Sequence, residues 1–106
     1  MAIDQGTVRI EGGPGNGRYV YDFADGTRSV LTYFERPVGV VTIDHTETPP
    51  RHRNQGVAGA LVARAVEDFR VAGKKIIPAC PFAYGEFRRH PEWSDLLLPD
   101  SENRVA

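Results

Sequence analysis

The first half of the chain alternates apolar and polar residues, as β-strands do. Tyr19, Tyr21 and Phe23 recur at every second position, so they share one face of a strand. Asp25 and Gly26 follow, and this dipeptide favours the tight turn of a hairpin. The pattern therefore predicts an antiparallel meander. Its strands are expected at residues 18–23, 28–35 and 38–44, after a short edge strand at residues 7–11.

The second half changes to the period of a helix. Apolar residues recur at every fourth position on one face of a helix that ends at about residue 72. These residues are Val57, Leu61, Ala65 and Phe69. An apolar segment at residues 74–79 predicts a further strand. A strand, a helix and a strand in succession form a βαβ unit, so the strands at 38–44 and 74–79 should be parallel neighbours.

Proline residues mark the C-terminal elements. Pro81 suits the first turn of a second helix, from Phe82 to about His90, and Pro91 ends it. The predicted fold class is therefore α+β: an antiparallel meander joined to one βαβ unit, with a short C-terminal helix. We expect a single domain over residues 1–106, with flexible segments at residues 1–17 and 99–106.

Composition and charge exclude several function classes. The chain has 106 residues, enough for one domain, and its net charge of −1 argues against non-specific binding to nucleic acid. A single cysteine excludes an internal disulfide and fits a reducing compartment. No segment resembles a secretory signal or a membrane span. We expect a cytoplasmic monomer or small homo-oligomer without nucleic-acid or membrane partners.

The start of the long helix is a candidate anion site. It consists of small residues: Gly56, Val57, Ala58 and Gly59. A helix start presents unpaired backbone N–H groups and a partial positive charge, and small side chains let a phosphate approach closely. The alternative is close packing of the helix against the sheet. Residues 12–17 are also rich in glycine but read as a loop, because no helix follows them.

Reactive side chains follow the two parallel strands. Ligands of a βαβ unit usually bind at the carboxyl ends of its strands, which are followed here by residues 44–47 and by Cys80. His45 or Glu47 could accept a proton from an ammonium group, although both could simply be solvated or hydrogen-bonded. Cys80 precedes Pro81 at a helix start, where a thiolate is favoured and could accept an acyl group. An inert, buried thiol is the alternative.

Other charged groups change this picture little. Cys80 and the three histidines lack the spacing of zinc ligands, so no metal site is expected. Arg51 and Arg53 precede the helix start and could reach a phosphate, whereas Arg88 and Arg89 read as solvated charges.

The loop before the long helix resembles that of a known family. Residues 53–58, Arg-Asn-Gln-Gly-Val-Ala, are similar to the Arg/Gln-x-x-Gly-x-Gly/Ala loop with which GNAT-type N-acetyltransferases hold the pyrophosphate of coenzyme A. Asn54 stands where the family often has glycine. The segments Cys80-Pro81-Phe82 and His90-Pro91-Glu92-Trp93 extend the resemblance, to the branch of very small GNAT-like proteins, over about residues 18–98.

The resemblance implies an enzyme that moves an acetyl group from acetyl-coenzyme A to a primary amine of a protein or small molecule. The candidate catalytic residues remain Cys80, Glu47 and His45, with Cys80 either a covalent relay or only part of the pocket wall. The implied cofactor-binding residues are Ile43, Asp44, His45, Arg53, Asn54, Gln55, Gly56, Val57, Ala58 and Gly59.

Two alternatives stay open. The chain lacks the N-terminal helices that wall the acceptor site of full-length GNAT enzymes, which favours a non-catalytic coenzyme-A-binding or interaction module of the same fold. A structural domain with an empty cleft is the third reading.

Overall fold

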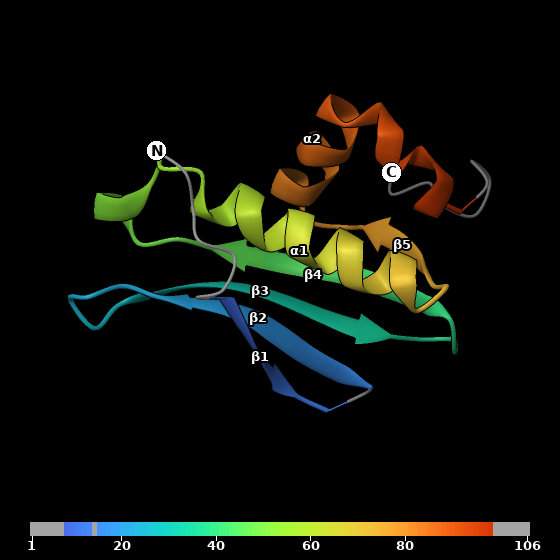
Figure 1. Ribbon diagram of the computed structural model, residues 1–106, viewed down its shortest axis with the longest axis horizontal. Helices are drawn as coiled ribbons and strands as arrows, with labels where there is room; N and C mark the ends of the chain where they lie inside the picture. The colour runs from blue at the N-terminus through green and yellow to red at the C-terminus, as the bar shows by residue number, and fades with distance from the viewer. Residues whose placement is uncertain (1–7, 14, 99–106) are drawn as a thin grey trace.

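The protein is built on a five-stranded mixed sheet whose helices lie on one face (Figure 1). The computed structural model describes residues 8–13 and 15–98. The strands are ordered β1-β2-β3-β4-β5, as along the chain. The elements are β1 (Val8–Gly12), β2 (Asn16–Asp22), β3 (Arg28–Glu35), β4 (Val40–Glu47), the 3₁₀ turn η2 (Pro50–His52), α1 (Val57–Val71), β5 (Lys75–Pro78), α2 (Pro81–Arg89) and the 3₁₀ turn η3 (Pro91–Leu96).

The first four strands form the antiparallel meander that the sequence predicts. Residues 8–12 belong to the segment expected to be flexible, yet they pair with β2, and Val8 is buried. The expectation of flexibility for residues 1–7 and 99–106 concerns parts of the chain outside the described residues. The α+β prediction is confirmed.

The strand β4 is displaced from its predicted range of 38–44. The N–H of Arg36 donates to the carbonyl of Val40 (2.9 Å), and the N–H of Val40 donates to that of Pro37 (3.0 Å). These bonds close a turn, so β4 begins at Val40. Its polar end, through Glu47, stays extended because β3 pairs with it.

The parallel pair predicted from the βαβ pattern is confirmed. β4 and β5 run parallel from the pair Val40–Lys75 to the pair Ile43–Pro78. The helix α1 connects them and crosses the same face of the sheet (Figure 1). The amino end of α1 therefore lies at the carboxyl end of β4, as the sequence argument requires.

The apolar core lies between the sheet and the helices. Leu61 and Ala65 of α1 are fully buried in one cluster with side chains of all five strands. The Tyr19 hydroxyl donates to Asp68 Oδ2 (2.9 Å), and burial together with this carboxylate raises the pKa of Tyr19 far above its usual value. No helix in the described part of the chain is long and apolar enough to cross a membrane.

A β-bulge changes the facing of side chains at the end of β4. Tyr33 of β3 pairs with Ile43, but the preceding Thr32 pairs with His45, so Asp44 is an extra residue in β4. An extra residue reverses the alternation beyond it. Ile43 and Thr46 consequently face the helices, whereas His45 shares the outer face with Thr32.

Side chains of opposite charge cover the outer face of the sheet near its β1 edge. Arg9 Nε donates to Asp22 Oδ2 (2.8 Å), and Arg18 Nε donates to Glu11 Oε1 (2.8 Å). Between these pairs Val20 is fully buried, although it faces away from α1. The charged layer thus keeps this half of the outer face solvated and polar.

The packing of α1 gives a prediction about stability. Leu61→Ala removes a fully buried side chain and leaves a cavity, so it should lower the free energy of unfolding by about 3 kcal/mol. Val71→Ala, on the same helix but 80% exposed, should change it by less than about 0.5 kcal/mol. Urea denaturation of both variants measures the difference, and equal losses would show that α1 is not the main support of the core.

Candidate functional site

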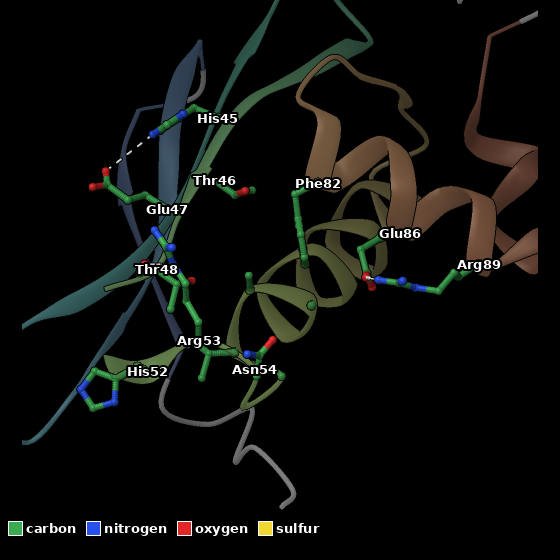
Figure 2. A pocket seen from close by; sticks show the side chains of 14 residues that line it. His45, Thr46, Glu47, Thr48, His52, Arg53, Asn54, Phe82, Glu86 and Arg89 are labelled. Atoms are coloured by element: carbon green, nitrogen blue, oxygen red, sulfur yellow. Dashed lines mark hydrogen bonds and ion pairs between the residues drawn. The ribbon is translucent and has the colours of Figure 1, made fainter. Parts of the chain in front are cut away.

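A cleft opens where the carboxyl end of β4 meets the first turn of α1 and one face of α2 (Figure 2). Its volume is about 850 Å³, which suits a small-molecule site. It is lined by His45, Thr46, Glu47, Thr48, His52, Arg53, Asn54, Gly56, Val57, Ala58, Gly59, Phe82, Glu86 and Arg89. All four residues of the helix start that the sequence singled out therefore line the cleft.

The cleft exists because β4 and β5 separate. Ile43 and Pro78 are the last paired residues. The carbonyl oxygen of Ile43 accepts the N–H of Ala79 (3.0 Å), the last bond of the parallel ladder, and also the N–H of Cys80 (3.1 Å), because the chain turns here toward α2. β4 continues to Glu47, and its backbone from this point borders the cleft.

The start of α1 presents free hydrogen-bond donors to the cleft. Gly56 is the N-cap residue of α1 and has a positive φ of 83°, a conformation that favours glycine. No side chain caps this end of the helix. The first intrahelical bond runs from the N–H of Ala60 to the carbonyl of Gly56 (3.0 Å). None of the described residues accepts a hydrogen bond from the N–H groups of Val57, Ala58 or Gly59. With no acidic side chain in the first turn, this site favours an anion.

The β2–β3 hairpin anchors the loop that leads to this helix start. Ser29, fully buried, donates to the carbonyl of Glu47 (3.0 Å) and is hydrogen-bonded to Thr48 Oγ1 (2.6 Å). Arg53 Nε donates to the carbonyl of Thr48 (3.2 Å), which fixes the stem of an arginine that lines the cleft. The loop therefore has a defined path although it contains little regular structure.

A second anchor joins the tip of the hairpin to the loop. The imidazole of His52 stacks on Phe23, with ring centroids 3.7 Å apart and planes 4° from parallel. His52 Nε2–H donates to Asp25 Oδ2 (2.9 Å). Hydrogen bonds from the side chain and backbone N–H of Thr27, and then the bond from His52, lower the pKa of Asp25 well below its usual value. The carboxylate is thus stabilised in the form that holds His52.

His45 and Glu47 point to the opposite face of the sheet from Thr46 (Figure 2). The bulge causes this, because it places His45 opposite Thr32 of the outer face and Thr46 opposite the buried Leu31. His45 Nε2 lies 3.6 Å from Glu47 Oε1, and the two side chains are 59% and 73% exposed. Both groups line the same cleft as the start of α1, but on its outer side.

Cys80 lies behind the cleft wall. It is the N-cap of α2, as expected, and its Sγ accepts the N–H of Ala83 at 3.3 Å. Its sulfur is 3.8 Å from Thr46 Oγ1, and only 6% of the residue is exposed. Thr46 and Phe82 line the cleft, whereas Cys80 belongs to the apolar cluster. The thiol is therefore more enclosed than the strand-end position predicted from the sequence.

Three further predicted residues do not line the cleft. The side chain of Ile43 is fully buried in the core, and its carbonyl already accepts two N–H groups. Asp44 is exposed at the bulge, where it accepts a hydrogen bond from Thr32 Oγ1 (2.8 Å). Gln55 is exposed beside the loop. The described residues contain no group of three or more His, Cys, Asp or Glu side chains that could hold a metal ion.

That α2 forms one wall of the cleft was not predicted from the sequence. Phe82, Glu86 and Arg89 line the cleft, whereas Ala83 and Phe87 face the core. Ala83 and Phe87 are four residues apart and so lie on one face of α2, the buried face. The residues that line the cleft lie on a different face of the helix. The sequence alone does not show that α2 packs beside the start of α1.

The fold agrees with comparisons to known proteins. The profile of the family described as GCN5-related N-acetyl-transferase matches residues 18–96, most of the chain. The chain belongs to this family. The solution structure of a GCN5-like candidate N-acetyltransferase from Staphylococcus aureus is similar, with a TM-score of 0.66 and 26% identity over 87% of this chain and 89% of that one. No match is found among curated proteins.

The hairpin anchor of this GNAT-family protein gives a prediction about pH. The lowered pKa of Asp25 stabilises the fold above the usual aspartate pKa of 3.8, and this stabilisation is lost as the pH falls below that value. Asp25→Asn should therefore lower the melting temperature at pH 7, and the difference from the wild type should shrink at about pH 3. Glu67→Gln, at an exposed position of α1, is the control. A difference that does not change with pH would show that the Asp25 carboxylate has no such role.

Proposed function

We propose that this protein binds acetyl-coenzyme A in the cleft and transfers the acetyl group to a primary amine of a protein or small molecule. Members of the family generally use acetyl-coenzyme A, which supports the choice of cofactor. The observation that carries the proposal is the uncapped start of α1: among the residues that the structure describes, none accepts a hydrogen bond from its first three N–H groups, and these residues line a cleft of about 850 Å³.

The cofactor phosphates fit the donors of this helix start. The N–H groups of residues 57–59 bind the pyrophosphate, and the small side chains of Ala58 and Gly59 permit the close approach. Arg53 adds a cation from the loop, while Asn54 and Gln55 shape the turn into α1. The pantetheine arm runs along the backbone of β4 at Ile43, Asp44 and His45. Ile43 is the last residue of β4 that pairs with β5, and the other two lie beyond this pair.

Coenzyme A supplies the acetyl group as a thioester, and the protein positions it and removes a proton from the amine. Thr46 points into the cleft from β4, and Phe82 lines the cleft from α2. The Phe82 ring shields the thioester from water. The acceptor amine approaches from the outer face of the sheet, where Glu47 and His45 lie at the rim. One of these two groups accepts the proton that the ammonium must lose before its nitrogen can attack.

In this proposal Cys80 supports the site and does not carry the acetyl group. Its sulfur caps α2 and lies against Thr46, so it fixes the wall that Phe82 belongs to. A covalent relay would require Thr46 to move aside and expose the thiol. The enclosure of Cys80 therefore favours direct attack by the amine.

The exposure of the proton-accepting groups supports a second candidate function. His45 and Glu47 are 59% and 73% exposed, and a group in water has less power to speed a reaction than one in an enclosed site. A protein that binds coenzyme A without turnover, and acts by interaction, would show the same cleft. A mass spectrum after incubation with acetyl-coenzyme A and a panel of amines distinguishes the two, because only an enzyme yields acetylated amine.

Cofactor binding is tested by a charge at the helix start. Ala58→Glu adds a carboxylate that stabilises α1 but repels a phosphate, so it should keep or raise the melting temperature and weaken coenzyme A binding about tenfold or more. Ala58→Gln, of nearly the same size and without charge, should weaken it far less. Titration calorimetry measures both. Equal affinities for the two variants would mean that no phosphate binds at the start of α1.

The catalytic roles are tested by comparing two substitutions. Glu47→Gln should reduce kcat with little change in KM for acetyl-coenzyme A, because it removes one of the two candidate proton acceptors at the outer rim. Cys80→Ala should retain most of kcat and lower the melting temperature, since it removes a buried cap. Steady-state kinetics give these values. Loss of turnover in Cys80→Ala, with an acetylated thiol in the wild type, would instead establish the relay.

A further inference from the structure

Glu86 is a charged residue of the cleft to which the proposed reaction assigns no role. Its side chain is 10% exposed and projects from α2 toward the first turn of α1 (Figure 2). A Cβ atom at Gly59 would lie 3.4 Å from Glu86 Oε1, so carboxylate and helix start are in close proximity. Oε2 accepts a hydrogen bond from Nη2 of Arg89. A buried carboxylate is unfavourable unless it is paired, so the partner matters.

Arg89 is held at the cleft although most of its side chain is exposed. The bond to Glu86 fixes a guanidinium that is 69% exposed and would otherwise sample many rotamers. The adjacent Arg88 differs, because its guanidinium lies 6.0 Å from the ring centroid of Tyr84 and does not line the cleft. Arg89 alone of the two is directed to the site before any ligand arrives.

The Glu86 carboxylate would repel a phosphate bound at the start of α1, and Arg89 offsets this repulsion. A phosphate on the N–H of Gly59 would lie near the Glu86 carboxylate, and two negative groups repel more strongly in a partly enclosed cleft than in water. A guanidinium bonded to Glu86 offsets this repulsion and keeps further N–H donors for phosphate oxygens. Arg53 supplies a cation from the opposite, loop side of the cleft.

We propose that Arg89, positioned by Glu86, is a phosphate-binding residue of the coenzyme A site. The proposal rests on the proposed function, since it assumes that the pyrophosphate lies at the start of α1. It adds that α2 recognises the phosphates as well as covering the pantetheine arm. Binding should therefore depend on the guanidinium only for ligands that carry phosphate.

Titration calorimetry with coenzyme A tests this on four proteins: the wild type, Arg89→Gln, Arg89→Lys and Arg88→Gln. Arg89→Gln should weaken binding about tenfold or more, because it removes a cation and leaves the Glu86 carboxylate with only His90 Nε2, 3.9 Å from Oε1, beside it. Arg89→Lys keeps the charge but loses the planar set of N–H donors, so its affinity should lie between those of the wild type and Arg89→Gln, and Arg88→Gln should bind as the wild type does. Equal affinities for Arg89→Gln and Arg88→Gln would overturn the proposal.

A second comparison separates phosphate binding from a structural role. Pantetheine, which lacks the phosphates, should bind equally to the wild type and Arg89→Gln, and a parallel loss for both ligands would overturn the proposal. Adding Glu86→Gln to Arg89→Gln should restore part of the lost affinity, because the carboxylate that has lost its guanidinium partner is gone. If the wild type itself binds no coenzyme A, the proposed function is wrong. If the wild type binds coenzyme A and Arg89→Gln binds it equally well, only the role of Arg89 is wrong.

Discussion

The carbonyl group of Ile43 is the junction on which the cleft depends. It accepts two N–H groups, from Ala79 and Cys80, at the point where the pairing of β4 with β5 ends and the chain turns toward α2. The sheet therefore stops on one side while β4 continues on the other, and α2 begins immediately beyond the junction. Had the ladder continued, the space beside residues 45–48 would be filled by β5, and no ligand could reach the start of α1.

The two faces of the sheet carry different parts of the proposed site. The inner face carries α1, whose first turn offers N–H groups, and α2, whose Glu86–Arg89 pair lies next to that turn. The outer face carries His45 and Glu47 at the rim. In our account the cofactor phosphates are recognised on the inner side and the acceptor amine on the outer side, with the gap between β4 and β5 connecting them.

The sequence was a good guide wherever one segment determines its own structure. The period of α1, the hairpin at Asp25-Gly26 and the parallel pair around α1 are confirmed, because each follows from local pattern or from the length of the connection. Gly56 could be placed at the helix start for the same reason: its positive φ suits a residue without a side chain.

The remainder depends on contacts between distant segments. The bulge at Asp44 adds one residue to β4 and reverses the facing of His45 and Glu47, which simple alternation from Ile43 would have turned inward. The contact of His52 with Phe23 and the approach of Glu86 to Gly59 join residues far apart in the chain. No local pattern encodes such pairs, so the sequence could name the chemistry of the site but not its arrangement.

The central claim is that the free N–H groups at the start of α1 hold the phosphates of coenzyme A. Amide resonances in ¹H–¹⁵N NMR spectra report this directly, since a charged acceptor shifts a bonded N–H downfield. Titration with coenzyme A should shift the signals of Val57, Ala58 and Gly59 downfield, and titration with pantetheine should leave them in place. Saturation of the protein with coenzyme A without any shift of these three signals would contradict the account.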